Sequence, residues 1–424
     1  MLPLLVLSLL LVLGSFSHPT KTSQGGNLHV NNILKSSKRL SGYPPLFPEH
    51  KRIIQDGQVP YYVVEYAPLV HLYSEEKYFP CDIARYVDHF HAVFGNGSDV
   101  PGGQHLNIGA LSKLNHYSAA KEGSEVYLMA NTDFDKNPDY ITGRHNKPKY
   151  INGEIEEAPA VLIVVDKGNG WVDAFWFYFY GFNLGPFVMG TGPFGNHVGD
   201  WEHSLVRFYN GSPIIVWMSA HGGGGSYFYK NLEKHYNDDK RPVIFSARGT
   251  HANYASVGQQ NHDLPWAMLS DFTDRGPLWD PTKNFLAYTY SDGRITYANG
   301  SHPKREERYG DWLYFEGRWG DNKLPSSDER QKWSPFEWKY IAGPTGPLSK
   351  NLDRLSPCQR TKWWNFWDGC NTRVYPKMGQ GIESEGNNGC GNIFRGIRSG
   401  IVRSFVQTIT WGGWGCWVLD LIYG

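Results

Sequence analysis

Two carboxylates and two imidazoles fall within one short stretch, Gly-Asn-His-Val-Gly-Asp-Trp-Glu-His, at residues 195–203. If a strand begins at Asp200, its side chains alternate, so Asp200 and Glu202 share one face about 7 Å apart and His203 points to the other. His197 lies in a glycine-flanked turn before this strand, where the backbone can fold the imidazole back over the strand end. Two carboxylates and one imidazole suit a hard cation such as Mg²⁺, Ca²⁺ or Mn²⁺. The pattern therefore predicts a divalent-cation site at His197, Asp200 and Glu202.

A structural role is the alternative for these carboxylates. Acidic residues near a strand start often accept hydrogen bonds from turn amides or pair with an arginine such as Arg207. Two further histidines, His221 and His251, each follow a strand-like run and have glycines nearby. We expect both to line the same polar cleft, although a lone histidine in this setting is more often structural.

Composition and local pattern favour an all-β, β-rich fold. Aromatic residues make up 15% of the 424 residues, and charged residues only 19%, below the ~25% of an average soluble domain. Short β-type runs separated by turn residues occupy 61–64, 126–129, 160–165, 171–180, 204–208, 214–218 and 243–247. Helical periodicity is clear only at 82–91 and 392–406. The sequence therefore predicts a jelly-roll-like β-sandwich core with few helices.

Composition also divides the chain into four parts. Residues 1–17 are an uncharged Leu/Val run with a small-residue cleavage site, typical of a signal peptide, and residues 18–42 form a polar pro-segment or linker. We expect the β-sandwich domain to span 43–342. A Gly/Pro-rich stretch then opens a Cys-rich C-terminal extension, 343–424, that packs on the core.

Cysteines and glycosylation motifs agree with a secretory route. Four of the five cysteines lie in the C-terminal extension, and we expect them to form two disulfides whose connectivity the sequence leaves open; they are Cys358, Cys370, Cys390 and Cys416. The fifth cysteine, Cys81, lies far upstream of these four and has no partner assigned by this count. Three Asn-Gly-Ser motifs predict glycans at Asn96, Asn210 and Asn299.

Charge and hydropathy exclude two classes of partner. The formal net charge is zero, so no basic excess points to a nucleic acid. The uncharged run 404–419 is shorter than the ~20 apolar residues that a membrane span needs, and we expect it to be a buried strand.

The order of motifs in residues 171–255 resembles the core of the necrosis- and ethylene-inducing peptide-like cytolysins, whose hallmark is Gly-His-Arg-His-Asp-Trp-Glu. The resemblance implies that His197, Asp200 and Glu202 correspond to that family's metal-binding residues, with Asn183 at the position of a further ligand. The hallmark's second histidine is Gly199 here and its first glycine is Asn196. These departures bear on the toxin activity more than on the ion site.

A resemblance over nearly the whole mature chain is to the vacuolar protein sorting-associated protein 62-like family of fungi, which has plant relatives. Tyr-Ala-Pro at 66–68, Ser-Glu-Glu-Lys-Tyr-Phe-Pro at 74–80, Gly-Thr-His-Ala at 249–252 and Tyr-Phe-Glu-Gly-Arg-Trp-Gly at 314–320 carry it, together with residues 195–202. It implies a role in vacuolar protein targeting and says nothing of chemistry.

Three functions fit these observations. The first is a non-enzymatic protein whose bound Mg²⁺ or Ca²⁺ organises a polar cleft for a glycan or glycolipid headgroup, since aromatic faces stack on sugars. The second is a secreted hydrolase in which Asp200 and Glu202 act as an acid/base pair or hold a metal-bound water. It is weakened because no Gly-x-Ser-x-Gly nucleophile motif is present. The third is a luminal trafficking or structural factor without a small-molecule site.

Overall fold

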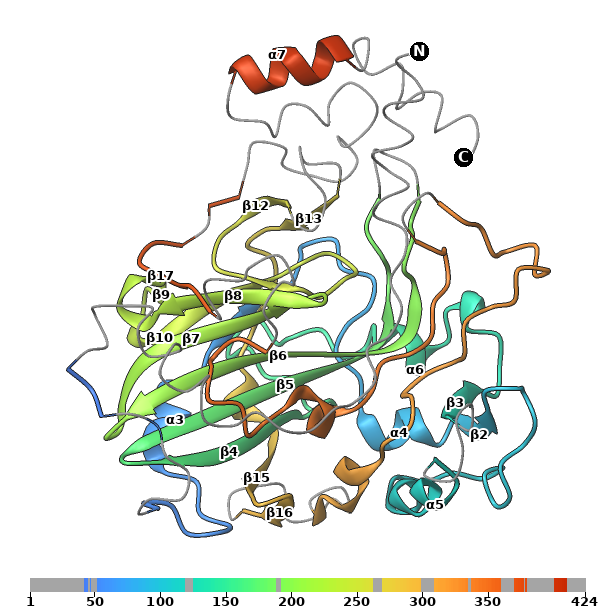
Figure 1. Ribbon diagram of the computed structural model, residues 1–424, viewed down its shortest axis with the longest axis horizontal. Helices are drawn as coiled ribbons and strands as arrows, with labels where there is room; N and C mark the ends of the chain where they lie inside the picture. Colours follow the sequence, from blue (N-terminus) through green and yellow to red (C-terminus); the bar gives the residue numbers. More distant parts are fainter. Residues whose placement is uncertain are drawn as a thin grey trace, which may run out of the picture.

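The computed structural model describes residues 42–44, 46, 52–118, 125–187, 192–261, 269–298, 309–334, 337–359, 370–376, 378–379 and 400–409. The expected signal peptide lies outside these residues, as does all of the expected pro-segment except Gly42. Figure 1 shows long strands crossing the centre of the molecule as one twisted sheet.

This large sheet has the strand order β16-β15-β4-β5-β6-β7-β8-β17. Its strands are β4 (Ala160–Gly168), β5 (Trp171–Asn183), β6 (His197–Tyr209), β7 (Ser212–Ala220), β8 (Gly223–Phe228), β15 (Phe285–Ser291), β16 (Arg294–Tyr297) and β17 (Thr372–Arg373). β15 runs parallel to β4 and β17 parallel to β8, while the other neighbours are antiparallel. Every residue of β5 is buried, because both faces of the sheet are covered.

A smaller sheet covers one face. It contains β1 (Leu69–His71), β9 (Lys234–His235), β10 (Asp238–Ser246), β11 (Asn253–Tyr254) and β14 (Leu278–Trp279), and β1 lies between β10 and β14. Val70 and Ile244 of this sheet share a buried core with Leu162, Trp176 and Val206 of the large sheet. Because two sheets enclose this core, the predicted β-rich sandwich is confirmed.

Helical turns and a two-stranded ribbon cover the other face. The ribbon pairs β2 (Phe90–Phe94) with β3 (Val126–Ala130), and a second ribbon elsewhere pairs β12 (Gly258–Asn261) with β13 (Ser270–Thr273). The short helices of the described chain are α3 (Tyr61–Glu65), α4 (Ile83–Val87), α5 (Asn115–Ser118), α6 (Asp139–Thr142), η2 (Ile108–Leu114), η3 (Phe134–Lys136), η4 (Tyr229–Asn231), η6 (Pro281–Lys283), η8 (Asp311–Tyr314) and η9 (Pro347–Lys350). Trp201 of β6, Trp312 and Trp319 lie in this second core with their rings 5.4–6.1 Å apart.

Two local predictions were wrong in part. Residues 61–64 form helix α3 and not a strand, because Pro60 begins the helix and Val63 is buried in the core between the sheets. The helix expected at 82–91 begins where Asp82 caps the N–H groups of Ala84 and Arg85, but it ends at Val87. Phe90 instead starts β2, whose cross-strand pairing overrides the helical pattern.

The C-terminal extension is attached to the large sheet by buried charges. Arg207 of β6 makes a bidentate ion pair with Asp173 of β5 at 2.7 Å and also donates to the carbonyl of Leu355 at 2.7 Å. Lys167 of β4 donates to the carbonyl of Leu352. Burial lowers the pKa of Lys167 to about 8, because the attraction of Asp173 offsets only part of the desolvation cost.

A disulfide joins Cys358 and Cys370 in this extension. Cys390 and Cys416, the other two cysteines expected to pair, lie outside the described residues. Cys81 is a free, buried thiol, and burial raises its pKa to about 12. It is therefore a packed core residue and not a reactive nucleophile.

Helix α7 (Gly400–Ile409) replaces part of the strand expected in the uncharged C-terminal run. Ile401 and Phe405 lie four residues apart on one helical face, which is the pattern that predicted a helix here, and both are exposed. Within the described part of the chain, we find no helix that is both long and apolar enough to cross a membrane.

Candidate functional site

The predicted carboxylates lie at one end of the space between the two sheets. In the β5–β6 ladder, Asp200 is opposite Tyr180 and Glu202 is opposite Tyr178. Residues opposite each other in a ladder share a face, so both carboxylates point toward the smaller sheet with the two tyrosines. Both carboxylate residues are buried. The core between the two sheets is therefore apolar except at this end, where the side chains form a polar cluster.

His203 occupies the opposite face of β6. Its ring stacks on Phe177 with centroids 4.8 Å apart and also contacts Trp217 at 4.8 Å. Neither ring nitrogen has a hydrogen-bond partner. Burial lowers the pKa of His203 well below its ordinary value, and Arg354 and Lys350 lower it further. His203 is thus a neutral core residue.

His251 lies at the centre of the polar cluster. Its Nδ1 is 3.0 Å from Oδ2 of Asp200, and its Nε2 is 3.0 Å from the carbonyl oxygen of Tyr78. The ring also stacks on Tyr180, with centroids 3.7 Å apart and planes within 3°. Both nitrogens face acceptors, so both carry protons and the ring is an imidazolium. Burial opposes this charge, but Asp200 and Glu76 outweigh it and raise the pKa of His251 to about 9.

Glu76 is the second acidic neighbour of His251, with its Oε1 3.8 Å from Nε2. The Glu76 carboxylate accepts hydrogen bonds from the backbone N–H groups of Lys77, Tyr78 and Gly249 at 2.8–2.9 Å. Burial acts to raise its pKa, yet His251 and these N–H groups lower it overall. Glu76 is therefore fully ionised and internally satisfied.

The charge of Glu202 is compensated less fully. It accepts a hydrogen bond from the hydroxyl of Ser219. Burial and the repulsion of Asp200 raise the pKa of Glu202 to about 8, and Lys350 and His221 reduce this shift only in part. Asn253 donates its Nδ2 to Ser219 Oγ at 3.4 Å, while its buried Oδ1 has no hydrogen-bond partner. Two carboxylates thus share the imidazolium of His251, Glu202 adds a third buried acidic group beside them, and the amide oxygen of Asn253 has no partner among the described residues.

His197 and Asn183 are opposite each other where β5 and β6 meet, at the start of β6. The predicted turn before Asp200 is instead part of β6, interrupted at Gly199, whose φ is +69°. A Cβ at Gly199 would lie 1.9 Å from the carbonyl oxygen of Trp319, so only glycine fits. His197 Nδ1 lies 2.6 Å from the carbonyl oxygen of Gly199, and Asn183 Nδ2 donates to that of Gly195 at 3.1 Å. Burial lowers the pKa of His197, and the nearby Asp200 partly offsets this.

His221 belongs to a neighbouring acidic cluster that the sequence did not indicate. Its Nε2 is 2.7 Å from Oδ2 of Asp271. Asp271 also accepts hydrogen bonds from the Thr250 hydroxyl at 2.9 Å and the Tyr254 hydroxyl at 2.6 Å. The His221 side chain is 22% exposed, so this cluster extends from the buried site toward solvent. Asp271 and Glu76 were missed because neither lies in a motif with metal-ligand spacing.

The donor types fit a hard cation, whereas a converged ligand set is not found. No three His, Cys, Asp or Glu side chains in the described part of the chain are arranged to hold a metal ion. His251 is already the counter-ion of Asp200. The oxygens that fit a cation in charge and type are those of Asp200, Glu202 and the unpartnered amide of Asn253. The cation site stays a prediction.

Comparison with known proteins gives a consistent family. Residues 48–263 match the family model described as "Vacuolar protein sorting-associated protein 62". Vacuolar protein sorting-associated protein 62 of Saccharomyces cerevisiae is 49% identical over 91% of this chain and 88% of its own length. The putative vacuolar protein sorting-associated protein TDA6 of the same yeast is 49% identical over 86% of this chain and 83% of its own.

Solved structures give only remote matches. Necrosis and Ethylene inducing Protein 2, from the agent of cocoa's witches' broom disease, is 12% identical over 55% of this chain and 77% of its own, with a TM-score of 0.23. NLPPya in complex with mannosamine is 12% identical over 64% of this chain and 99% of its own, also with a TM-score of 0.23. At these scores the likeness carries no argument about the ligand of this chain.

We predict that His251 is structurally essential and His221 is not. His251→Ala leaves Asp200 and Glu76 buried without their counter-ion, so it should lower the free energy of unfolding by about 3–5 kcal/mol. His221→Ala, at the part-exposed rim, should cost about 1–2 kcal/mol. Urea denaturation followed by tryptophan fluorescence measures both. Equal costs for the two variants would contradict the central role of His251.

Proposed function

The chain belongs to the vacuolar protein sorting-associated protein 62 family, and from this premise we propose that it is a cation-dependent glycan-binding protein of the secretory and vacuolar compartments that acts in vacuolar protein targeting. The cation is Mg²⁺ or Ca²⁺, held near Asp200 and Glu202 in part through water. The ligand is a glycan or the headgroup of a glycolipid, bound at the end of the sandwich that the polar cluster forms.

The observation that carries this proposal is the surplus of buried acidic groups at that end. Asp200 and Glu76 share one imidazolium, that of His251, and the buried Glu202 lies near Asp200, whose repulsion helps to raise its pKa to about 8. A divalent cation would compensate the remaining charge, and its hydration shell would reach ligands that do not converge within bonding distance. His197, which Asp200 influences electrostatically, and Asn183 opposite it on β5 are the candidates to contact that shell.

Glycan recognition is supported by the polar side chains around this cluster. The amide oxygens of Asn253, beside Ser219, and of Gln259 and Gln260, on the strand that pairs with Asp271, are buried acceptors without partners among the described residues. Sugar hydroxyls are donors of the kind that such acceptors lack, and a bound cation can also accept hydroxyl oxygens as ligands. The part-exposed His221 lies on the side from which a ligand would approach.

A hydrolase is less well supported by the same geometry. Asp200 is engaged by His251, and the Ser219 hydroxyl donates to Glu202, so neither group is positioned as a free base or an activated nucleophile. The contacts serve to hold charge in place, which favours binding over turnover.

We predict that a divalent cation stabilises the folded protein. At a cation concentration a hundredfold above Kd, the free energy of unfolding should rise by about 2.7 kcal/mol, and EDTA should reverse the gain. Asp200→Asn should abolish most of the increment, because it removes a charge from the site. The increment is measured by denaturant unfolding with and without Mg²⁺ or Ca²⁺.

Two controls accompany this measurement. Asp99 is an exposed carboxylate that is remote from Asp200 in the sequence. The Asp99→Asn variant should therefore keep the full stabilisation by the cation. His203→Ala, on the opposite face of β6, should lower the baseline stability yet keep the cation increment. The cation proposal fails if Asp200→Asn responds to the cation as strongly as the wild type.

We predict that glycan binding depends on the cation and on His221. On a glycan array, binding should fall at least tenfold in EDTA and in His221→Ala. His116→Ala, on helix α5 and remote in sequence from the site, serves as the matched histidine control. If EDTA left glycan binding undiminished, the result would show that glycan binding does not require the cation.

We predict N-glycans at Asn96 and Asn210 in the native secretory pathway. Both residues are exposed, and Asn210 and Gly211 form the turn between β6 and β7 with φ of 45° and 80°. Asn299 is the third expected acceptor and lies outside the described residues. Endoglycosidase treatment should increase gel mobility, and an unchanged mobility would refute modification of these sites.

A further inference from the structure

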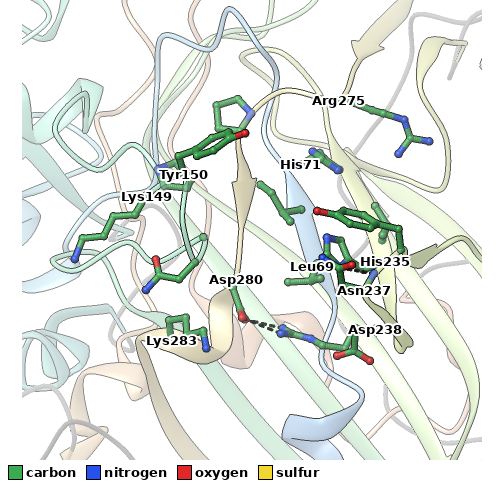
Figure 2. Close-up of a pocket in the computed structure, with 18 of the residues that line it drawn as sticks. Leu69, His71, Lys149, Tyr150, His235, Asn237, Asp238, Arg275, Asp280 and Lys283 are labelled. Atoms are coloured by element: carbon green, nitrogen blue, oxygen red, sulfur yellow. Dashed lines mark hydrogen bonds and ion pairs between the residues drawn. The ribbon is translucent and has the colours of Figure 1, made fainter.

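A large open groove lies on the outer side of the smaller sheet, away from the polar cluster. Its volume is about 1330 Å³, above the roughly 300–1,000 Å³ of ordinary small-molecule pockets. Three segments distant in sequence form its walls: residues 147–153, the β9–β10 hairpin at 233–241, and residues 275–283. Figure 2 shows Lys149 and Tyr150 on one side of the groove, and His235 and Asn237 on the other.

The floor of the groove is the outer face of β1, β10 and β14. Val70 and Ile244 point into the core, so the alternate residues Leu69, His71 and Val243 face outward into the groove. The Nδ1 of His71 is 2.8 Å from the carbonyl oxygen of Gly276 and donates to it, since a carbonyl oxygen only accepts. The Nδ1 side of the His71 ring is thus fixed by a hydrogen bond to the wall formed by residues 275–283.

Two exposed tyrosines stand at the rims. Tyr150 and Ile151, at the tip of the first wall, are 104% and 96% exposed. Tyr236, at the tip of the β9–β10 hairpin, is 88% exposed. Exposed rings on two separate walls of one groove can stack on the apolar faces of sugar rings.

The charge of the lining is unbalanced. Six lysine or arginine side chains line the groove against three acidic ones, although the whole chain is neutral. Two of the acids are already paired: Asp280 accepts both Nη atoms of Arg241 at 2.7–2.8 Å, and Glu233 does the same for Arg275. These pairs leave little free negative charge in the groove.

Three lysines of the lining form no ion pair with a described residue, and one of them, Lys234, is held by the carbonyl oxygens of Tyr229 and Leu232. The other two, Lys147 and Lys283, are exposed and form no ion pair with a described residue, although Glu154 attracts Lys283 weakly. They belong to two neighbouring segments of the lining, and Figure 2 places Lys283 on the same side as Lys149. Together they would attract a phosphate or carboxylate.

The wall nearest β14 is closed to an extended peptide. The backbone N–H of Asp280, at the end of β14, donates to the carbonyl of Gly153 at 2.8 Å, so the first wall already covers this strand edge. Peptides that add a strand to a sheet need a free edge. The tyrosines, the lysines and the occupied edge together favour a sugar over a peptide.

We propose that this groove is a second binding site, specific for an anionic carbohydrate that bears a phosphate or carboxylate group. The anion is bound by Lys147 and Lys283, and the sugar rings lie against Tyr150 and Tyr236. The site shares no residue with the cluster around Asp200, so it does not depend on the cation.

Titration calorimetry of the purified protein tests this site with glucose 6-phosphate, glucuronate, glucose and inorganic phosphate. We expect saturable binding of at least one anionic sugar, at least tenfold tighter than glucose and than inorganic phosphate. The double variant Lys147→Gln/Lys283→Gln should weaken anionic-sugar binding at least tenfold, and Tyr236→Ala should weaken it several-fold. The first two ligands distinguish a phosphate from a carboxylate as the source of the charge.

The controls separate this site from the proposed cation-dependent function. Lys136→Gln changes an exposed lysine on η3 and should leave binding unchanged, as should EDTA and Asp200→Asn. The proposal is overturned if no anionic sugar binds, if the double lysine variant binds as tightly as the wild type, or if EDTA abolishes binding. Tighter, lysine-dependent binding of tetraglutamate than of any sugar would also overturn it and assign the groove to acidic peptides.

Discussion

The imidazolium of His251 holds the two sheets together at the polar end of the sandwich. It follows β10 of the smaller sheet, yet its Nδ1 contacts Asp200 on β6 of the large sheet, and its ring stacks on Tyr180 of β5. Without it, Asp200 and Glu76 would be buried charges without compensation, which a core does not tolerate. The apolar core and the acidic cluster can share one interior because this residue links them.

The single imidazolium also leaves the charge of the acidic cluster incompletely compensated. His251 neutralises Asp200 and Glu76 in part, whereas Glu202 accepts a hydrogen bond from the Ser219 hydroxyl and is only partly compensated by Lys350 and His221. A fold needs only enough charge pairing to keep its sheets together, and additional carboxylates in that position weaken it. Glu202 and the amide oxygen of Asn253, which has no partner among the described residues, are the groups on which the proposed ligand site rests.

The smaller sheet gives the molecule two separate polar regions. Its inner face completes the apolar core, and its end carries His251 and Asn253 into the acidic cluster. Its outer face, which no other sheet of the described chain covers, forms the floor of the groove between two tyrosine-bearing walls. One region gathers acidic side chains and the other basic ones, so the ligands that we propose for them differ in chemistry.

The amino-acid sequence alone determined the local features. Period-two alternation put Asp200 and Glu202 on one face of β6 and His203 on the other, and β-type runs predicted β3, β4, β5, β6, β7 and β10. Residues 61–64 show the limit, since a strand-like run without a pairing partner became a helix behind Pro60.

Tertiary structure decided which distant residues meet. Asp200 and His251 are 51 positions apart, and His251 and Tyr78 are 173 apart, so no local pattern encodes their contact. It arises because β1 pairs in parallel with β10, which brings the segments that follow both strands to the same end of the sandwich. The groove likewise needs three separated segments. Strand pairing across long stretches of chain depends on the whole core, whereas alternation depends only on the backbone of one strand.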